Sequence, residues 1–247
     1  MAETKGSDRL ELYYSLAAAQ LEEVFTSQKE GMIRLAELWA DAIEGDHMLY
    51  SFGSGHSRFI AGELYWRAGG LAAALSIDDP ALGAAERVEG YAETFMKMYE
   101  LEAGDLLVVI SNSGINPVPL EVALYAKEYG VTVIALTNLT HSSKAESRHS
   151  SGKKLFEVAD LVIDTGGQRG DAVVPLEGVD WRVGPTSTMI SVALLNAVVA
   201  QTAQNLLERG ITPPALISAN VAEGDEHNEQ VGERYWRRLT HFPRKPL

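Results

Sequence analysis

The sequence predicts an α/β fold, a three-layer αβα sandwich on a five-stranded parallel sheet with a helical N-terminal extension. Two observations predict it. From residue 45 onward, short apolar runs alternate with helix-like segments, which is typical of parallel βαβ units. Before that point, apolar side chains recur at helical spacing without such runs. With 247 residues, of which 46% are hydrophobic and 22% charged, the chain can form one large core.

The N-terminal extension, residues 1–44, is expected to form two helices that break near Ser27. One stripe of apolar residues runs through both helices, with Leu10, Tyr14 and Leu21 in the first and Leu35 and Trp39 in the second. We interpret this stripe mainly as core packing. A helical pair of this kind also often supplies an oligomer surface, and we expect a homodimer or homotetramer.

The remainder, residues 45–247, is predicted as a single domain, because no repeat, low-complexity tract or linker divides it. The strands are expected at residues 48–52, 71–77, 106–111, 131–137 and 161–164. Helices are expected at residues 58–68, 84–99, 117–129, 186–209 and 226–239, with a weaker one at 142–147. Residues 166–182 mix glycines with charges and receive no assignment.

The first strand ends in a glycine- and serine-containing loop, Gly53-Ser54-Gly55-His56-Ser57, directly before a helical segment. Such a loop presents unpaired backbone N–H groups and the positive end of a helix dipole beside two hydroxyls, which suits an anion. It is neither a Walker loop, since no lysine follows, nor a dinucleotide fingerprint, since the third glycine is absent. A simple structural connector is the alternative.

The third strand ends in a similar loop, Ser111-Asn112-Ser113-Gly114-Ile115-Asn116, followed by Pro117 at the start of a helix. Here the alternative is a turn capped by Asn116. In a flavodoxin-like strand order 2-1-3-4-5 the first and third strands are neighbours, and their C-terminal loops flank the point where ligands bind. Two donor-rich loops therefore face one crevice.

Together the two loops resemble the SIS (sugar isomerase) domain, a similarity that covers residues 44–209 and includes the fourth strand and residues 159–164. The resemblance implies that Ser111, Ser113 and the backbone at Gly114 hold the phosphate of a sugar, while Ser54 and Ser57 face the sugar itself. The remaining binding residues implied are Gly53, Gly55, His56, Asn112, Asn116, Thr186 and Ser187.

Two of these positions carry their own alternatives. Asn116 stands where the family usually has Ser or Thr, although an amide can still donate to an oxyanion. Thr186-Ser187-Thr188 opens the long helix after Gly184-Pro185, and it either closes the ligand pocket or only caps the helix.

An aldose–ketose isomerisation transfers a proton between adjacent carbons through an enediol, and therefore needs a carboxylate or imidazole beside them. Resemblance to the phosphoheptose isomerases of the same superfamily suggests Glu63 and His227 as this acid/base pair. A solvated surface charge is the alternative for Glu63, and helix capping within an acidic cluster is the alternative for His227. His56 competes as the active imidazole. SIS proteins commonly place a site at a subunit boundary, so the resemblance also implies that His227 can act in the pocket of a neighbouring subunit.

The resulting prediction is a cytoplasmic phosphosugar isomerase, with a lyase or etherase acting on an amino-sugar phosphate, or a noncatalytic sugar-phosphate sensor, as alternatives. A net charge of -13 and a pI near 4.9 disfavour binding to nucleic acid or to an anionic membrane. The chain has no cysteine, and its histidines lack tight ligand spacing, so neither a metal nor another cofactor is expected. No apolar run suggests a membrane span.

Overall fold

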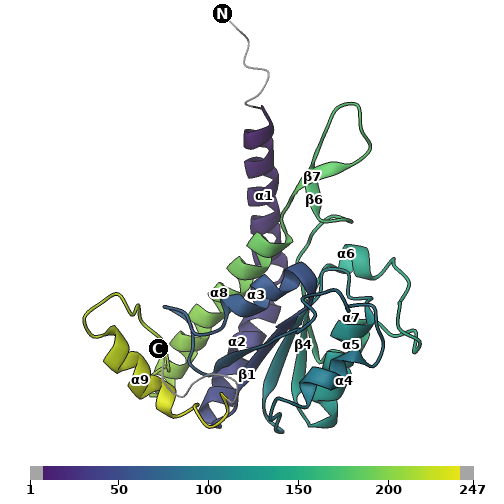
Figure 1. Cartoon of the computed structure of the whole chain (residues 1–247). Helices are drawn as coiled ribbons and strands as arrows, with labels where there is room; N and C mark the ends of the chain where they lie inside the picture. The colour runs from purple at the N-terminus through teal and green to yellow at the C-terminus, as the bar shows by residue number, and fades with distance from the viewer. Residues whose placement is uncertain (1–7, 240–247) are drawn as a thin grey trace, which may run out of the picture.

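The computed structural model describes residues 8–239 and is built on five parallel strands in the order β2-β1-β3-β4-β5 (Figure 1). The strands are β1 Leu49–Gly53, β2 Ala74–Ile77, β3 Leu106–Ile110, β4 Thr132–Thr137 and β5 Leu161–Asp164. The neighbouring strands β1 and β3 are buried along their whole length, as expected for a sheet covered on both faces. The predicted sandwich and strand order are confirmed.

Helices cover both faces of this sheet (Figure 1). One face carries α2 Lys29–Glu44, α3 Arg58–Glu63 and α8 Ser187–Glu208, and the other carries α4 Tyr91–Met96, α5 Pro117–Glu128 and α7 Leu155–Val158. α2 and α8 pack together over β3, β4 and β5, where Leu35, Ile134 and Leu194 meet in the core. Contrary to expectation, α8 is long and apolar enough to cross a membrane, although core helices pass the same test.

The N-terminal helix α1, Asp8–Ser27, projects beyond the sheet, and a two-stranded hairpin lies beside it (Figure 1). The hairpin pairs β6 Ala172–Pro175 with β7 Arg182–Pro185 and accounts for part of the segment that the sequence left unassigned. The Tyr13 hydroxyl donates to the carbonyl oxygen of Pro185 over 3.0 Å, which attaches the hairpin to α1. The predicted break between the two N-terminal helices is confirmed.

The helix expected at residues 84–99 is wrong for its first half. Within this range only α4, Tyr91–Met96, is helical, and the residues before it form turns. Gly90, whose backbone is left-handed (φ 80°), interrupts this range, and Gly83 (φ 95°), also left-handed, directly precedes it. The Asp79 carboxylate also accepts from the backbone N–H groups of Ala81 and Gly83, at 3.0 and 2.8 Å, and so stabilises a turn in place of helical hydrogen bonds.

Several other predicted boundaries are also corrected. α3 ends at Glu63, because the following residues form turns in which Trp66 has a φ of 41°. Residues 71–73 precede β2, and residues 69–72 pair instead with residues 214–216, through hydrogen bonds and the bridge between Leu71 and Ala215. The weak helix is α6, Leu139–Ser142, and the last helix is α9, Gly224–Glu233, with turns after it.

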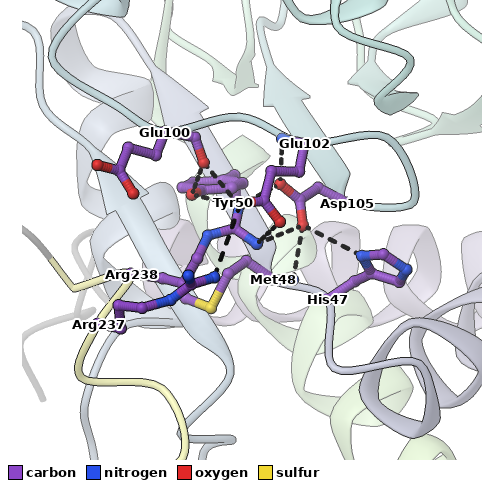
Figure 2. A network of polar contacts seen from close by, with 8 residues as sticks. All are labelled: His47, Met48, Tyr50, Glu100, Glu102, Asp105, Arg237 and Arg238. Atoms are coloured by element: carbon purple, nitrogen blue, oxygen red, sulfur yellow. Dashed lines mark hydrogen bonds and ion pairs between the residues drawn. The ribbon is translucent and has the colours of Figure 1, made fainter.

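The end of the described chain is anchored at the edge of the sheet where the strands begin (Figure 2). Arg238 is 6% exposed and donates to both carboxylate oxygens of Asp105, at 2.5 and 3.4 Å. It also donates to Glu102 and to the backbone oxygen of Glu100. Burial raises the pKa of the adjacent Tyr50 to about 12, against the opposing effect of the Arg238 charge.

Candidate functional site

A cleft of about 460 Å³ opens at the carboxyl ends of β1 and β3. Both predicted loops contribute to it. Its lining residues are Ser54, Gly55, His56, Ser57, Ile60, Glu86, Ser111, Asn112, Ser113, Asn116, His141, Gly170, Asp171, Pro185, Ser187 and Thr188. The structure therefore brings most of the expected binding residues to one crevice. Three of the expected residues, Gly53, Gly114 and Thr186, do not line the cleft.

The first loop turns from β1 into a short 3-10 helix, Gly55–Ser57, ahead of α3. Ser54 is buried, and its hydroxyl donates to Asp79 over 2.7 Å, so that its oxygen lone pairs remain for a hydrogen-bond donor on a ligand. Gly53 is required by packing, because a Cβ there would overlap the carbonyl group of Ser57. Gly55 needs its left-handed φ of 56°, and a Cβ on Gly83 would overlap its backbone.

The second loop is held by its own serine. Ser111 is buried and its Oγ accepts from the Gly114 N–H over 3.2 Å, which leaves the Ser111 hydroxyl hydrogen available to a ligand. Gly114 has a φ of 62°, and a Cβ at this position would lie 2.8 Å from Ser142 Oγ and 3.0 Å from Thr137 Oγ1. A side chain at Gly114 would therefore displace the base of the loop.

Four buried polar atoms beside the second loop have no hydrogen-bond partner within residues 8–239. They are Asn112 Oδ1, Thr137 Oγ1, His141 Nδ1 and Ser142 Oγ. Buried polar atoms are normally paired, so an unpaired group of them is unusual in a structural turn. Because Asn112 and His141 also line the cleft, a ligand or ordered water has donors and acceptors to satisfy there.

Asn116 occupies the N-cap position of α5 with Pro117 directly after it, as the sequence predicted. Its side chain makes no capping hydrogen bond, and its Oδ1 instead accepts from Arg148 Nη1 over 2.7 Å. Arg148 also donates its backbone N–H to the Ile115 carbonyl oxygen. The segment after α6 thus brings a guanidinium to the second loop, a contribution that reading the two glycine loops did not find.

The start of α8 forms another wall. Both of its first N–H groups, from Thr186 and Ser187, donate to Asp171 Oδ1, and the Ser187 hydroxyl donates to Asp171 Oδ2. Ser187 lines the cleft, whereas the fully buried Thr186 donates its hydroxyl to Gln20 on α1 over 2.7 Å. Asp171 acts as the helix cap. Sequence reasoning missed it because it follows the cleft-lining Gly170 in the unassigned segment.

Charge is distributed unevenly around the cleft. Burial lowers the pKa of His141, and the nearby cations Arg169 and Arg148 lower it further, so the imidazole is neutral at neutral pH. These two guanidiniums make the His141 wall electropositive, although the chain as a whole is acidic. Glu86 adds a carboxylate to the same cleft.

The predicted acid/base residues lie outside this cleft. Glu63 is paired with Arg67, accepts from Asn196 Nδ2 at 3.4 Å, and lines a neighbouring pocket beside Phe59 and Asp78. His227 donates from Nε2 to the carbonyl oxygen of Ala215 over 2.9 Å. It belongs to α9, which lies low at the side of the sandwich, away from the hairpin and α6 (Figure 1). Glu63 and His227 thus have separate partners within the chain, Arg67 and Asn196 for the first and Ala215 for the second.

No cluster of three or more histidine, aspartate or glutamate residues that could hold a metal ion occurs in the described chain. The groups that the cleft presents are hydroxyls, amides, imidazoles and carboxylates, with cations at its rim. Such a set can bind an anion with several hydroxyl groups attached, and it can exchange protons with it.

A parallel α/β sandwich with paired serine loops at the switch point of its sheet defines a class of sugar-binding domains, and the chain matches the SIS domain family over residues 12–138. It belongs to this family. It is 37% identical over 236 residues to a UPF0309 protein of Listeria innocua, covering 92% of this chain and 96% of that protein. A UPF0309 protein of Geobacillus kaustophilus is 38% identical over 236 residues, with 92% and 94% covered.

Solved structures share the fold at low identity. A phosphoheptose isomerase from Neisseria gonorrhoeae superposes with a TM-score of 0.55 and 22% identity, covering 80% of this chain and 98% of that one. The NanR protein of Vibrio vulnificus, solved with ManNAc-6P, has a TM-score of 0.53 and 14% identity, with 94% and 70% covered. The first is named as an enzyme and the second was solved as a complex with a sugar phosphate.

Proposed function

We propose that the chain binds a phosphorylated sugar in the cleft between the two serine loops and interconverts its aldose and ketose forms through an enediol. The observation that carries this proposal is that Ser111 and Ser113 line one cleft with the first loop, beside Asn112 and His141, which each have a buried polar atom without a hydrogen-bond partner in the described chain. A phosphate would accept hydrogen bonds from the Ser111 and Ser113 hydroxyls, and the family membership and the names of the structural neighbours agree with such a ligand.

The two loops divide the ligand between them. The phosphate is held at the second loop by Ser111, Ser113 and the Asn116 amide, with Arg148 beside it as a charged donor. The sugar hydroxyls face the first loop, where Ser54 accepts and Ser57 donates or accepts. Charge-assisted hydrogen bonds to a dianion are the strongest contacts in this arrangement.

For the proton transfer, the family resemblance suggests Glu63 and His227 as the acid/base pair, and titratable residues of the cleft itself are the alternative. Since neither Glu63 nor His227 lines the cleft of its own chain, their participation requires a second copy of the chain, and we propose a homo-oligomer on that basis. The half-exposed side chain of Phe59, in the pocket of Glu63, provides apolar surface for such a contact.

A noncatalytic sugar-phosphate sensor is the second candidate, supported by the similarity to the NanR fold. A thermal-shift screen of pentose, hexose, heptose and amino-sugar phosphates against the same sugars without phosphate tests both. Stabilisation by phosphorylated sugars alone, following RT ln(1 + [L]/Kd), supports the site. Turnover of a stabilising ligand supports the isomerase, binding without turnover supports the sensor, and indifference to every phosphosugar contradicts both.

A further inference from the structure

We propose that Glu86 is the catalytic base that removes the carbon-bound proton of the phosphosugar, assisted by the imidazole of His141 in the same cleft. This inference rests on the proposed isomerase function. It assigns proton transfer to two residues of one chain that lie outside the glycine loops, in place of the Glu63 and His227 pair suggested by family resemblance.

The backbone of Glu86 is fixed between the two loops. Its N–H donates to the Gly83 carbonyl oxygen over 3.2 Å, and its own carbonyl oxygen accepts from the Val118 N–H, also over 3.2 Å. Gly83 packs against Gly55 of the first loop, and Val118 lies in the first turn of α5, directly after the second loop. Glu86 therefore sits where a ligand bridging both loops has its reacting carbons.

Glu86 is also the carboxylate of the cleft that is not engaged elsewhere. Asp171 uses both oxygens on the first turn of α8, and Asp79, behind Ser54, uses both on hydroxyl and backbone groups. The Glu86 side chain, half-buried, makes no hydrogen bond or ion pair with any residue between 8 and 239. A carboxylate placed in a cleft without a partner is available to a substrate.

His141 approaches the same space from the other side of the second loop. It lies in α6, whose preceding residue Asn138 donates its N–H to the Asn112 carbonyl oxygen over 3.1 Å. The ring lines the cleft and its buried Nδ1 has no partner among the residues described. Burial and the charges of Arg169 and Arg148 lower the pKa of His141, so it meets a substrate as a neutral imidazole that can both donate and accept.

The reaction balances with these two groups alone. The Glu86 carboxylate takes the proton from the carbon next to the carbonyl group, and the C–H electron pair forms the C=C bond of an enediolate, whose charge the His141 N–H stabilises. The hydroxyl proton moves between the two oxygens by way of the imidazole. Protonated Glu86 then returns its proton to the neighbouring carbon, so enzyme and proton count are restored.

The test compares Glu86→Gln with wild type, using arabinose 5-phosphate, fructose 6-phosphate, glucosamine 6-phosphate and sedoheptulose 7-phosphate in D₂O. NMR follows deuterium incorporation at the carbon next to the carbonyl group. We expect exchange and turnover to fall by about 10²- to 10⁴-fold in Glu86→Gln, with the Kd for the sugar phosphate changed less than about threefold. His141→Gln should lower turnover by about 10- to 100-fold.

Glu93→Gln is the matched control, because Glu93 lies on α4 outside the cleft and is paired with Lys97 on the surface. Full exchange by Glu86→Gln, or a loss confined to Kd, would overturn the role of Glu86 and leave the proposed function standing. Binding by wild type without exchange on any of the four sugars would overturn the isomerase and this role together. Equal thermal midpoints for the variants and wild type establish that folding is intact.

Discussion

Buried polar groups at the two ends of the sheet differ in how completely the chain itself provides their hydrogen bonds. Where the strands begin, each oxygen of Asp105 is used: Oδ1 accepts from the Met48 N–H at 2.9 Å, and Oδ2 from the Glu102 N–H at 2.8 Å, in addition to Arg238 (Figure 2). Where the strands end, polar atoms of Asn112 and His141 are buried without partners in the described chain.

This difference separates a structural network from a binding site. An unpaired buried polar group costs about 1–3 kcal/mol, so a fold keeps several together only where something else restores their hydrogen bonds. At the other end, His47 Nδ1 and Arg238 Nε make no hydrogen bond within the described chain, yet the charges there are matched, since His47 Nδ1 lies 3.8 Å from Asp105 Oδ1 and Arg238 pairs with Asp105. We therefore expect substitutions at the beginning of the strands to change stability, and those at their ends to change binding.

The largest effect is expected from Arg238→Met, which leaves the fully buried Asp105 carboxylate without its cation. Removing one partner of a buried pair costs about 3–5 kcal/mol, which urea denaturation will measure as a lower free energy of unfolding. Arg237→Met is the control, because Arg237 is exposed and lies 3.9 Å from Glu102. If the arginine network contributed to the site, phosphosugar affinity would fall as well, contrary to our expectation.

Gly114→Ala should act at the opposite end. Its φ of 62° and the nearby Ser142 Oγ oppose a Cβ, so the second loop must shift, and we expect about a 100-fold loss of affinity for arabinose 5-phosphate by calorimetry. Gly152→Ala provides the control, since Gly152 has a φ of 70° but no atom within 4 Å of its added Cβ. Equal binding by both variants would show that the loop does not hold the phosphate.

Arg148→Ala should weaken binding of arabinose 5-phosphate about tenfold, because it removes a charged group beside the Asn116 amide. Affinity for unphosphorylated arabinose should not change. Lys144→Ala is the control for the loss of one surface charge from the same segment. If binding of both sugars weakened equally, Arg148 would contact the sugar end of the ligand and not its phosphate.

The smallest expected effect is on the free energy of unfolding at alkaline pH. The pKa of Tyr50 is raised from 10.0 to about 12, so between these values the unfolded chain loses a proton that the folded chain retains, and stability falls as pH rises. The resulting loss of unfolding free energy, relative to neutral pH, should be about 1 kcal/mol at pH 10.5. Tyr50→Phe should remove it, giving a flatter dependence of unfolding free energy on pH between 9 and 11. An unchanged slope would contradict the buried, protonated Tyr50.

Much of the candidate site could be predicted from sequence because its two loops are local features. Glycine, serine and asparagine at the ends of strands determine turn geometry over a few residues, and strand order then makes the loops neighbours. Asn116 shows the limit of this reasoning. Its N-cap position was correct, but the partner of its side chain, Arg148, is remote in sequence and could be found only in three dimensions.

The expected helix at 84–99 failed for a related reason. Its apolar spacing was compatible with a helix, but the Asp79 carboxylate and two left-handed glycines favour turns. Glu86 consequently faces the cleft from a turn between the loops instead of lying on a helix. A carboxylate in an apparently helical stretch carries no local sign of such a role.

The sequence by itself determined the class of fold and the two serine loops, because periodicity, apolar runs and turn residues act over short distances, whereas the strand order was predicted by analogy with flavodoxin-like folds. Tertiary structure alone decided which charges meet. It placed Glu63 and His227 outside the cleft of the serine loops, brought Glu86 and His141 into that cleft, and paired Arg238 with Asp105. Pairing of this kind depends on packing between remote segments, whose contact energies no local pattern records.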